Sequence, residues 1–248
     1  MNQKKLIVAN WKSNPNDLAS AVKLAKAIDH KNVVIAVPFP FLPAVYKQLK
    51  KSALGAQDLF WADGPYTGEV SAQDLKILKV KYVIVGHSER RKNLKETDEM
   101  INLKLKAALR GGLRAVLCVG EPATVRKKGI KEAKKFVKQQ LVNDLKSTNK
   151  LLKLKANKLI IAYEPVWAIS TGKGSEPDTP EDAVGMIKFI KEILYSKFHI
   201  LNPKVLYGGS VNAKNAKGFL REKEVDGALV GGASLLPLEF HKVINAII

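Results

Sequence analysis

Short apolar runs alternate with longer amphipathic stretches along the whole 248-residue chain. Several runs, such as VVIAV, YVIVG and LIIAY, are apolar at consecutive positions, which is typical of strands buried on both faces of a parallel sheet. The predicted strands are Leu6–Asn10, Val33–Val37, Leu54–Gln57, Tyr82–Gly86, Arg114–Val119, Leu159–Tyr163, Lys204–Tyr207 and Gly227–Val230. The third of these, within KKSALGAQDLF, has the weakest apolar signal.

The stretches between the predicted strands have the periodicity of amphipathic helices. The segment TPEDAVGMIKFIKEIL opens with Thr179 as an expected N-cap and Pro180 in the first turn. A Gly pair after DEMINLKLKAALR is an expected C-cap, and the last helix is predicted near PLEFHKVINAII. The clearest expected buried stripes are Leu18, Val22, Ala25 and Ile28 in one helix, and Ile101, Leu105 and Ala108 in another.

Strands that alternate with helices eight times in this length predict an α/β protein with a closed, single-domain (β/α)8 barrel over residues 1–248. An open doubly wound sheet is the alternative. No low-complexity linker or long block of like charge divides the chain.

Composition narrows the class of protein further. The formal net charge is +19, which suggests nucleic-acid binding as one alternative, but only six of the 42 basic residues are arginine, and the lysines are spread along predicted helices. We therefore expect solvated lysine faces. No stretch of 18 apolar residues and no long apolar N-terminal run is present, so we expect a cytoplasmic protein. The single cysteine, Cys118, lies within an apolar run and is expected to be a core residue.

In a (β/α)8 barrel, reactive side chains gather at the carboxyl ends of the strands. Asn10 and Lys12 follow the first predicted strand, His87 follows the fourth and Glu164 follows the sixth. Burying a carboxylate between the apolar LIIAY and PVW costs desolvation free energy, which suggests that Glu164 has a functional role. The seventh and eighth strands end in Gly-rich turns, GGS and GGAS, that lead toward helical patterns. The free N–H groups at a helix N-terminus can bind a phosphate. No role is assigned to the other histidines, His30, His199 and His241.

These positions lie within motifs that resemble the triosephosphate isomerase family across nearly the whole chain. The matching stretches, in the family's order, are NWK, GAQD, YTGEVSAQDL, KYVIVGHSERR, ETDE, LCVGE, AYEPVWAI, YGGSVN and DGALVGGASL. The resemblance implies interconversion of dihydroxyacetone phosphate and glyceraldehyde 3-phosphate, in glycolysis and gluconeogenesis, with no metal or organic cofactor. Another phosphate-binding barrel isomerase or aldolase acting on a small sugar phosphate is the alternative.

This family is itself a standard example of tuned acid–base chemistry, so the roles of its reactive residues are carried over by resemblance. Glu164 would be the base that removes a proton beside the carbonyl. His87 would be a neutral electrophile that polarises the carbonyl. Lys12 would hold the anionic substrate, Asn10 would help to orient it, and Glu89 would support Lys12.

The resemblance also implies a phosphate site and a lid. Backbone N–H groups of Ser170, Ser210, Gly231 and Gly232 would bind the phosphate. The lid, AISTG, would close over it, with Tyr207 and Ser210 as its latch. Two departures concern the lid. Ser170 stands where the family usually has glycine, and the connection KGSEPDTPEDA is longer than usual, which leaves the second hinge unplaced between Lys173 and Pro177. The chain is also shortened near Lys50–Leu54.

The segment WADGPYTGEV resembles the family's subunit-contact loop, in which Thr67 would enter a pocket of a second copy beside the catalytic lysine. A homodimer is therefore expected, with a tetramer as an alternative. The expected partners are a triose phosphate and a second subunit, with neither nucleic acid nor membrane.

Overall fold

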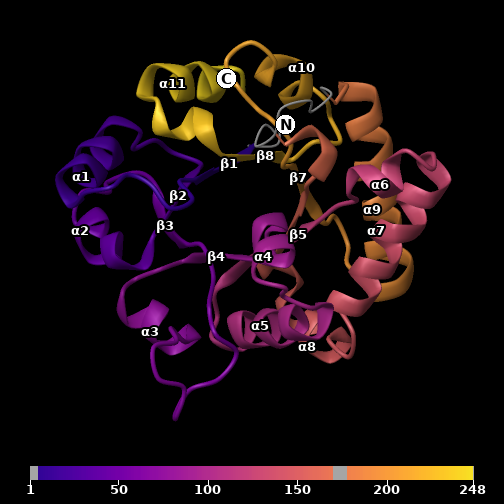
Figure 1. Ribbon diagram of the computed structural model, residues 1–248, viewed down its shortest axis with the longest axis horizontal. Coiled ribbons are helices and arrows are strands. Elements are labelled where there is room, and N and C mark those ends of the chain that lie inside the picture. Colours follow the sequence, from indigo (N-terminus) through magenta and orange to yellow (C-terminus); the bar gives the residue numbers. More distant parts are fainter. Residues whose placement is uncertain (1–4, 170–177, 248) are drawn as a thin grey trace.

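The structure, a computed structural model, describes residues 5–169 and 178–247. Its strands form a closed parallel barrel in the order β1 to β8, with the helices outside it (Figure 1). The strands are β1 (Leu6–Asn10), β2 (Val33–Val37), β3 (Ala53–Ala56), β4 (Tyr82–Val85), β5 (Arg114–Val119), β6 (Leu159–Tyr163), β7 (Lys204–Tyr207) and β8 (Gly227–Val230). The predicted (β/α)8 barrel is confirmed. The open-sheet alternative is wrong because β1 pairs with β8, Val8 lying opposite Leu229.

Helices and short 3-10 turns connect the strands. The α-helices are α1 (Leu18–Ala27), α2 (Leu42–Tyr46), α3 (Ala72–Ile77), α4 (Ser88–Asn93), α5 (Asp98–Arg110), α6 (Ala123–Arg126), α7 (Ile130–Asp144), α8 (Asn149–Lys155), α9 (Pro180–Phe198), α10 (Ala216–Leu220) and α11 (Pro237–Asn245). The 3-10 turns are η1 (Phe39–Phe41), η2 (Ala156–Lys158), η3 (Val166–Ala168) and η4 (Gly232–Leu235).

The strand bounds agree with the sequence pattern except at β3 and β4. Strand β3 begins and ends one residue earlier than predicted, since its pairing with β2 runs from Ala53 to Ala56. Strand β4 ends at Val85 because the next residue, Gly86, takes the left-handed conformation, with φ +70°.

Two apolar layers build the core. One fills the inside of the barrel and includes Val8, Ala36, Ile84, Cys118, Ile160 and Leu229. The other lies between the strands and the surrounding helices. It includes the alternate strand residues, whose side chains point away from the barrel interior, such as Ile7, Ile35 and Ile161. Burial on both faces explains why the strands are apolar at consecutive positions. The prediction for Cys118 is confirmed: it is fully buried, and this burial raises the pKa of its thiol well above the usual range.

The predicted helix signals are mostly confirmed. Thr179 caps α9 by accepting a hydrogen bond from the Asp182 N–H at 3.2 Å, and Gly112 beyond α5 has φ +82°. The stripe predicted for α5 is buried as expected. The stripe predicted for α1 is wrong in part, because Leu18 is 50% exposed and Val22 is half-buried. The buried face of α1 instead consists of Ala21, Leu24 and Ala25, with Ile28 after its end.

One buried ionic cluster joins the end of β3 to α5. The ammonium of Lys104 pairs with both Asp58 and Glu96, and Arg90 contacts the same two carboxylates at 2.8 and 2.7 Å. Because the charges are opposite and in contact, each offsets the desolvation of the other.

Candidate functional site

Every second side chain of a strand faces the barrel interior, and this period continues just past the strand's carboxyl end. These ends form the rim of the barrel. Along β6, Ile160 and Ala162 face the barrel interior, so the same two-residue period directs Glu164 inward just past the strand. Val8 leads in the same way to Asn10, and Leu229 leads to Gly231. Segments distant in sequence therefore deliver their side chains to one place.

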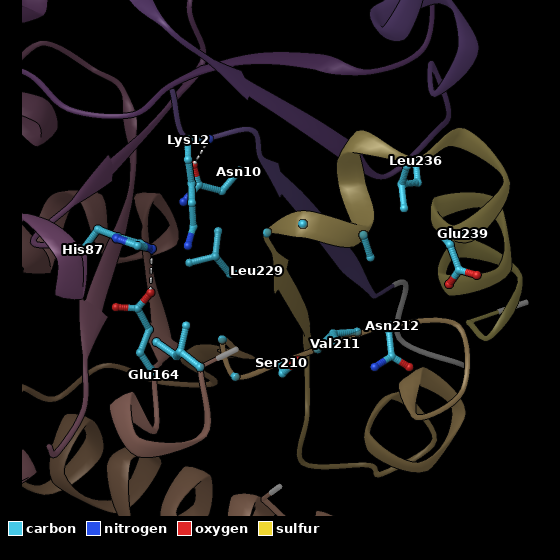
Figure 2. A pocket seen from close by; sticks show the side chains of 16 residues that line it. Asn10, Lys12, His87, Glu164, Ser210, Val211, Asn212, Leu229, Leu236 and Glu239 are labelled. Atoms are coloured by element: carbon cyan, nitrogen blue, oxygen red, sulfur yellow. Dashed lines mark hydrogen bonds and ion pairs between the residues drawn. The ribbon is translucent and has the colours of Figure 1, made fainter. Parts of the chain in front are cut away.

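Glu164 is almost wholly enclosed, with 2% of its surface exposed. Its Oε1 lies 3.0 Å from His87 Nε2 (Figure 2). Its Oε2 accepts a hydrogen bond of 2.9 Å from the Ser88 backbone N–H. Both carboxylate oxygens thus have a polar partner, as a buried charge requires. A Cβ built on Gly120 would lie 1.6 Å from the Glu164 carbonyl oxygen, so only glycine fits there.

His87 is the N-cap of α4, and this position determines which ring nitrogen can carry a proton. Its Nδ1 accepts a hydrogen bond of 3.3 Å from the Glu89 N–H, so Nδ1 has no hydrogen in this arrangement. The Glu89 carboxylate is 3.7 Å from Nδ1, beyond normal hydrogen-bond distance. In a neutral ring the proton would therefore be on Nε2, the nitrogen that lies 3.0 Å from Glu164 Oε1.

Lys12 lies just past β1 with φ +54°, a left-handed conformation that is uncommon for a residue with a Cβ. Its backbone N–H donates to Asn10 Oδ1 at 3.1 Å, and its ammonium lies 2.5 Å from Glu89 Oε1. The Lys12 ammonium, the Asn10 amide and the Glu89 carboxylate thus lie together on one side of the site.

A pocket of about 360 Å³ opens between these residues and the ends of β7 and β8. In Figure 2, Asn10, Lys12, His87 and Glu164 lie on one side of it, and Ser210, Val211 and Asn212 lie across it. Of the predicted site residues, those lining it are Asn10, Lys12, His87, Glu164, Ser210, Gly231 and Gly232. Ser170 and the second hinge between Lys173 and Pro177 lie outside the described residues.

The Gly-rich turns do not lead directly into α-helices, which differs from the sequence expectation. After β7, no helix begins until Ala216, and after β8 the turn enters the 3-10 helix η4 at Gly232 before α11 starts. Asn215 occupies the N-cap position of α10, and its side-chain N–H donates to the Ser210 carbonyl at 2.7 Å.

Tyr207 lies beneath the site and does not line the pocket. It is buried, and its ring stacks on Phe219 at a centroid distance of 4.1 Å. Burial, and then the negative charge of Asp178, raise the pKa of Tyr207 above its usual range, so it keeps its proton.

Sequence reasoning missed Glu121, which follows β5 and is fully buried. Its Oε1 accepts hydrogen bonds from the Tyr163 hydroxyl at 3.1 Å and the Trp167 indole N–H at 2.9 Å. Burial raises the pKa of this carboxyl. The available signal was its place at a strand end within LCVGE, the same kind of position that singled out Glu164.

Within residues 5–169 and 178–247, no group of three or more His, Cys, Asp and Glu side chains is arranged to hold a metal ion. In the same part of the chain, no helix combines the length and apolar content needed to span a bilayer.

The closed barrel and its rim, where an acid–base pair faces an ammonium across a small pocket, define a (β/α)8-barrel enzyme of the acid–base class. The family model described as triosephosphate isomerase matches residues 5–247. The chain belongs to the triosephosphate isomerase family, which confirms the resemblance seen in its motifs.

Curated relatives bearing the name triosephosphate isomerase are similar over nearly their full lengths. The protein from Dictyoglomus thermophilum is 40% identical, covering 98% of this chain and 100% of the relative. That from Caldanaerobacter subterraneus subsp. tengcongensis is 42% identical, covering 97% and 98%. That from Acidithiobacillus ferrooxidans is 43% identical, covering 97% and 95%.

Proposed function

We propose that this chain, as one domain over residues 1–248, interconverts dihydroxyacetone phosphate and D-glyceraldehyde 3-phosphate through an enediol or enediolate, a step of glycolysis and gluconeogenesis. The observation that carries the proposal is the contact of 3.0 Å between His87 Nε2 and Glu164 Oε1 at the wall of a pocket that also contains Lys12. This contact supports the proposal because proton transfer beside a carbonyl requires a base and a proton donor close together where a small substrate fits.

Glu164 is the base in this proposal. Before substrate binds, its two oxygens are held by His87 Nε2 and the Ser88 N–H. The carboxylate has to leave these partners and rotate toward the substrate to take the proton from the carbon beside the carbonyl. Gly208 leaves room for that rotation, since a Cβ there would already lie 3.0 Å from Glu164 Cγ.

His87 and Lys12 stabilise the charge that develops on the substrate oxygen. When Glu164 leaves, the Nε2–H of His87 is free to donate to that oxygen, and its neutral form matches an enediol better than an imidazolium would. The ammonium of Lys12 supplies positive charge in a partly enclosed site, where it interacts more strongly than in water. His87 passes the hydroxyl proton from one substrate oxygen to the other, and Glu164 returns the carbon-bound proton to the neighbouring carbon, so the carbonyl moves by one position.

The phosphate binds at the other end of the pocket. Ser210, Gly231 and Gly232 line this end, and their backbone N–H groups are the proposed donors, together with that of Ser170. Tyr207 and Ser210 are the proposed latch for the lid. A closed lid would exclude water and protect the enediolate from losing phosphate.

A coupled assay tests the proposal. Glyceraldehyde 3-phosphate is supplied, and the dihydroxyacetone phosphate formed is reduced by glycerol-phosphate dehydrogenase with loss of NADH absorbance. We expect saturable turnover that falls by about 100-fold or more in Glu164→Asp, since shortening the side chain displaces the base by about 1 Å. A folded wild-type chain without turnover would overturn the proposal, and turnover of another sugar phosphate in its place would support the alternative isomerase or aldolase.

We also propose that the chain is a cytoplasmic homodimer in which Thr67 of one copy enters the other. Residues 63–69 are all exposed. The ring centroids of Tyr66 in this loop and Phe60 before it are 4.7 Å apart, and this packing stabilises the base of the loop. Beside Lys12, a second cavity of about 260 Å³ is lined by Glu89, Arg90 and the exposed Leu94, among others, and is the proposed receptor.

Sedimentation velocity tests the dimer. Thr67→Trp, which is too bulky for the cavity, is expected to shift the protein toward monomer, whereas Lys138→Ala on the outer face of α7 leaves the dimer intact. A monomeric wild type at micromolar concentration would contradict the assembly.

A further inference from the structure

The left-handed backbone of Lys12 has a specific partner in the GAQD stretch, to which the sequence assigned no role. Gln57 directly follows β3, and its side-chain Nε2 donates to the Lys12 carbonyl oxygen at 2.8 Å. The same Nε2 donates to the carbonyl of Ala36 on β2 at 2.9 Å. Both hydrogens of one amide are therefore used on backbone groups of two neighbouring segments.

These contacts form part of a closed set around the exit of β1. The Ala36 carbonyl also accepts the Trp11 N–H at 3.1 Å, and Lys12 itself donates its N–H to Asn10 Oδ1. The peptide groups on both sides of the Lys12 Cα are thereby held. A residue with a Cβ stays in a disfavoured conformation only where its surroundings enforce it.

We propose that Gln57 is a positioning residue that holds Lys12 in this conformation and so sets the place of its ammonium. Rotation of φ from +54° to an ordinary negative value would turn the Cα–Cβ bond about the N–Cα axis. The ammonium would then leave Glu89 and the pocket. Gln57 does not line the pocket that contains Glu164, so it acts through Lys12 and not on the substrate. This inference rests on the role proposed for Lys12.

A double-mutant cycle tests this coupling. Gln57→Ala is made in the wild type and in Lys12→Ala, and two quantities are measured: kcat/KM in the coupled assay and the Kd of inorganic phosphate by calorimetry. In the wild-type background we expect kcat/KM to fall by about 100-fold and phosphate to bind more weakly, because a displacement of about 1 Å has that effect on rate. In Lys12→Ala, the same change is expected to alter both quantities less than twofold.

Gln139→Ala on the exposed face of α7 is the matched control and should change neither quantity. If Gln57→Ala does not fold, Gln57→Glu keeps the side-chain shape but replaces the donor by an acceptor, and the same loss is expected. Equal losses in both backgrounds, or no loss in the wild-type background, would overturn the proposal.

Gln57 also borders the cavity proposed to receive Thr67 of a second copy, so sedimentation velocity is run on each variant. A loss of activity that occurs only with dissociation of the dimer would assign the effect to the subunit contact and overturn the positioning role. A wild type without isomerase activity would refute the proposed function alone, because the phosphate cycle would still report whether Gln57 acts through Lys12.

Discussion

Substitution of Gly120 by alanine tests how the end of β5 places Glu164. The new Cβ would lie 1.6 Å from the Glu164 carbonyl oxygen, and the separation has to open to at least 3.0 Å, a shift of about 1.4 Å. Overpacking of this kind costs about 1–3 kcal/mol in stability. A displacement of the base by about 1 Å lowers the rate by about 100-fold, which corresponds to about 2.7 kcal/mol in the activation barrier.

The coupled assay gives kcat/KM, and circular dichroism gives the melting temperature. Gly185→Ala is the matched control, because its Cβ would meet nothing within 4 Å in α9, so activity is unchanged and the helix is slightly stabilised. Gly208→Ala places its Cβ 3.0 Å from Glu164 Cγ and 3.1 Å from the Tyr163 carbonyl oxygen, which needs a much smaller shift than Gly120→Ala, so it is expected to lower activity with less loss of stability. If Gly120→Ala does not fold, Gly208→Ala is used to test the placement of Glu164 in its stead. A folded Gly120→Ala with wild-type kcat/KM would refute this account of how Glu164 is placed.

Three further predictions concern buried polar groups. Trp167→Phe leaves the buried Glu121 without its indole donor and should lower the free energy of unfolding in urea by about 1–3 kcal/mol; an unchanged midpoint would contradict this. Lys104→Met removes the buried ammonium from Asp58 and Glu96 and leaves them with Arg90 alone, so it should destabilise by about 3 kcal/mol. Exposed Lys138→Ala should stay within about 0.5 kcal/mol, and similar losses in the two variants would speak against the ionic cluster. Burial raises the pKa of Asp144 to about 7, so the folded state binds an extra proton there above the unfolded pKa of about 3.9. The stability of the wild type relative to Asp144→Asn should therefore fall as pH rises from about 4 to about 7, by up to about 1.4 kcal/mol per pH unit, and a flat difference would show that the folded pKa is not raised.

The strand pattern predicted most of the barrel because a parallel sheet covered on both faces has a strong local signal. Strand β6, LIIAY, is apolar throughout and its bounds are as predicted. Strand β3, ALGA, has little apolar surface, and its ends depend on pairing with β2, so the prediction was displaced by one residue. In α1, periodicity alone allowed two adjacent stripes, and packing against the barrel selected the one without Leu18.

The sequence by itself determined the class of fold and the family, and it predicted which candidate residues follow the strands, because two-residue alternation and family motifs are local properties of the chain. Only the tertiary structure decided which atoms meet. The contacts of Glu164 with His87 and Ser88, and the hydrogen bond from Gln57 to Lys12, each join different strand ends. Such contacts depend on the register and closure of the whole barrel, which no short segment of sequence contains.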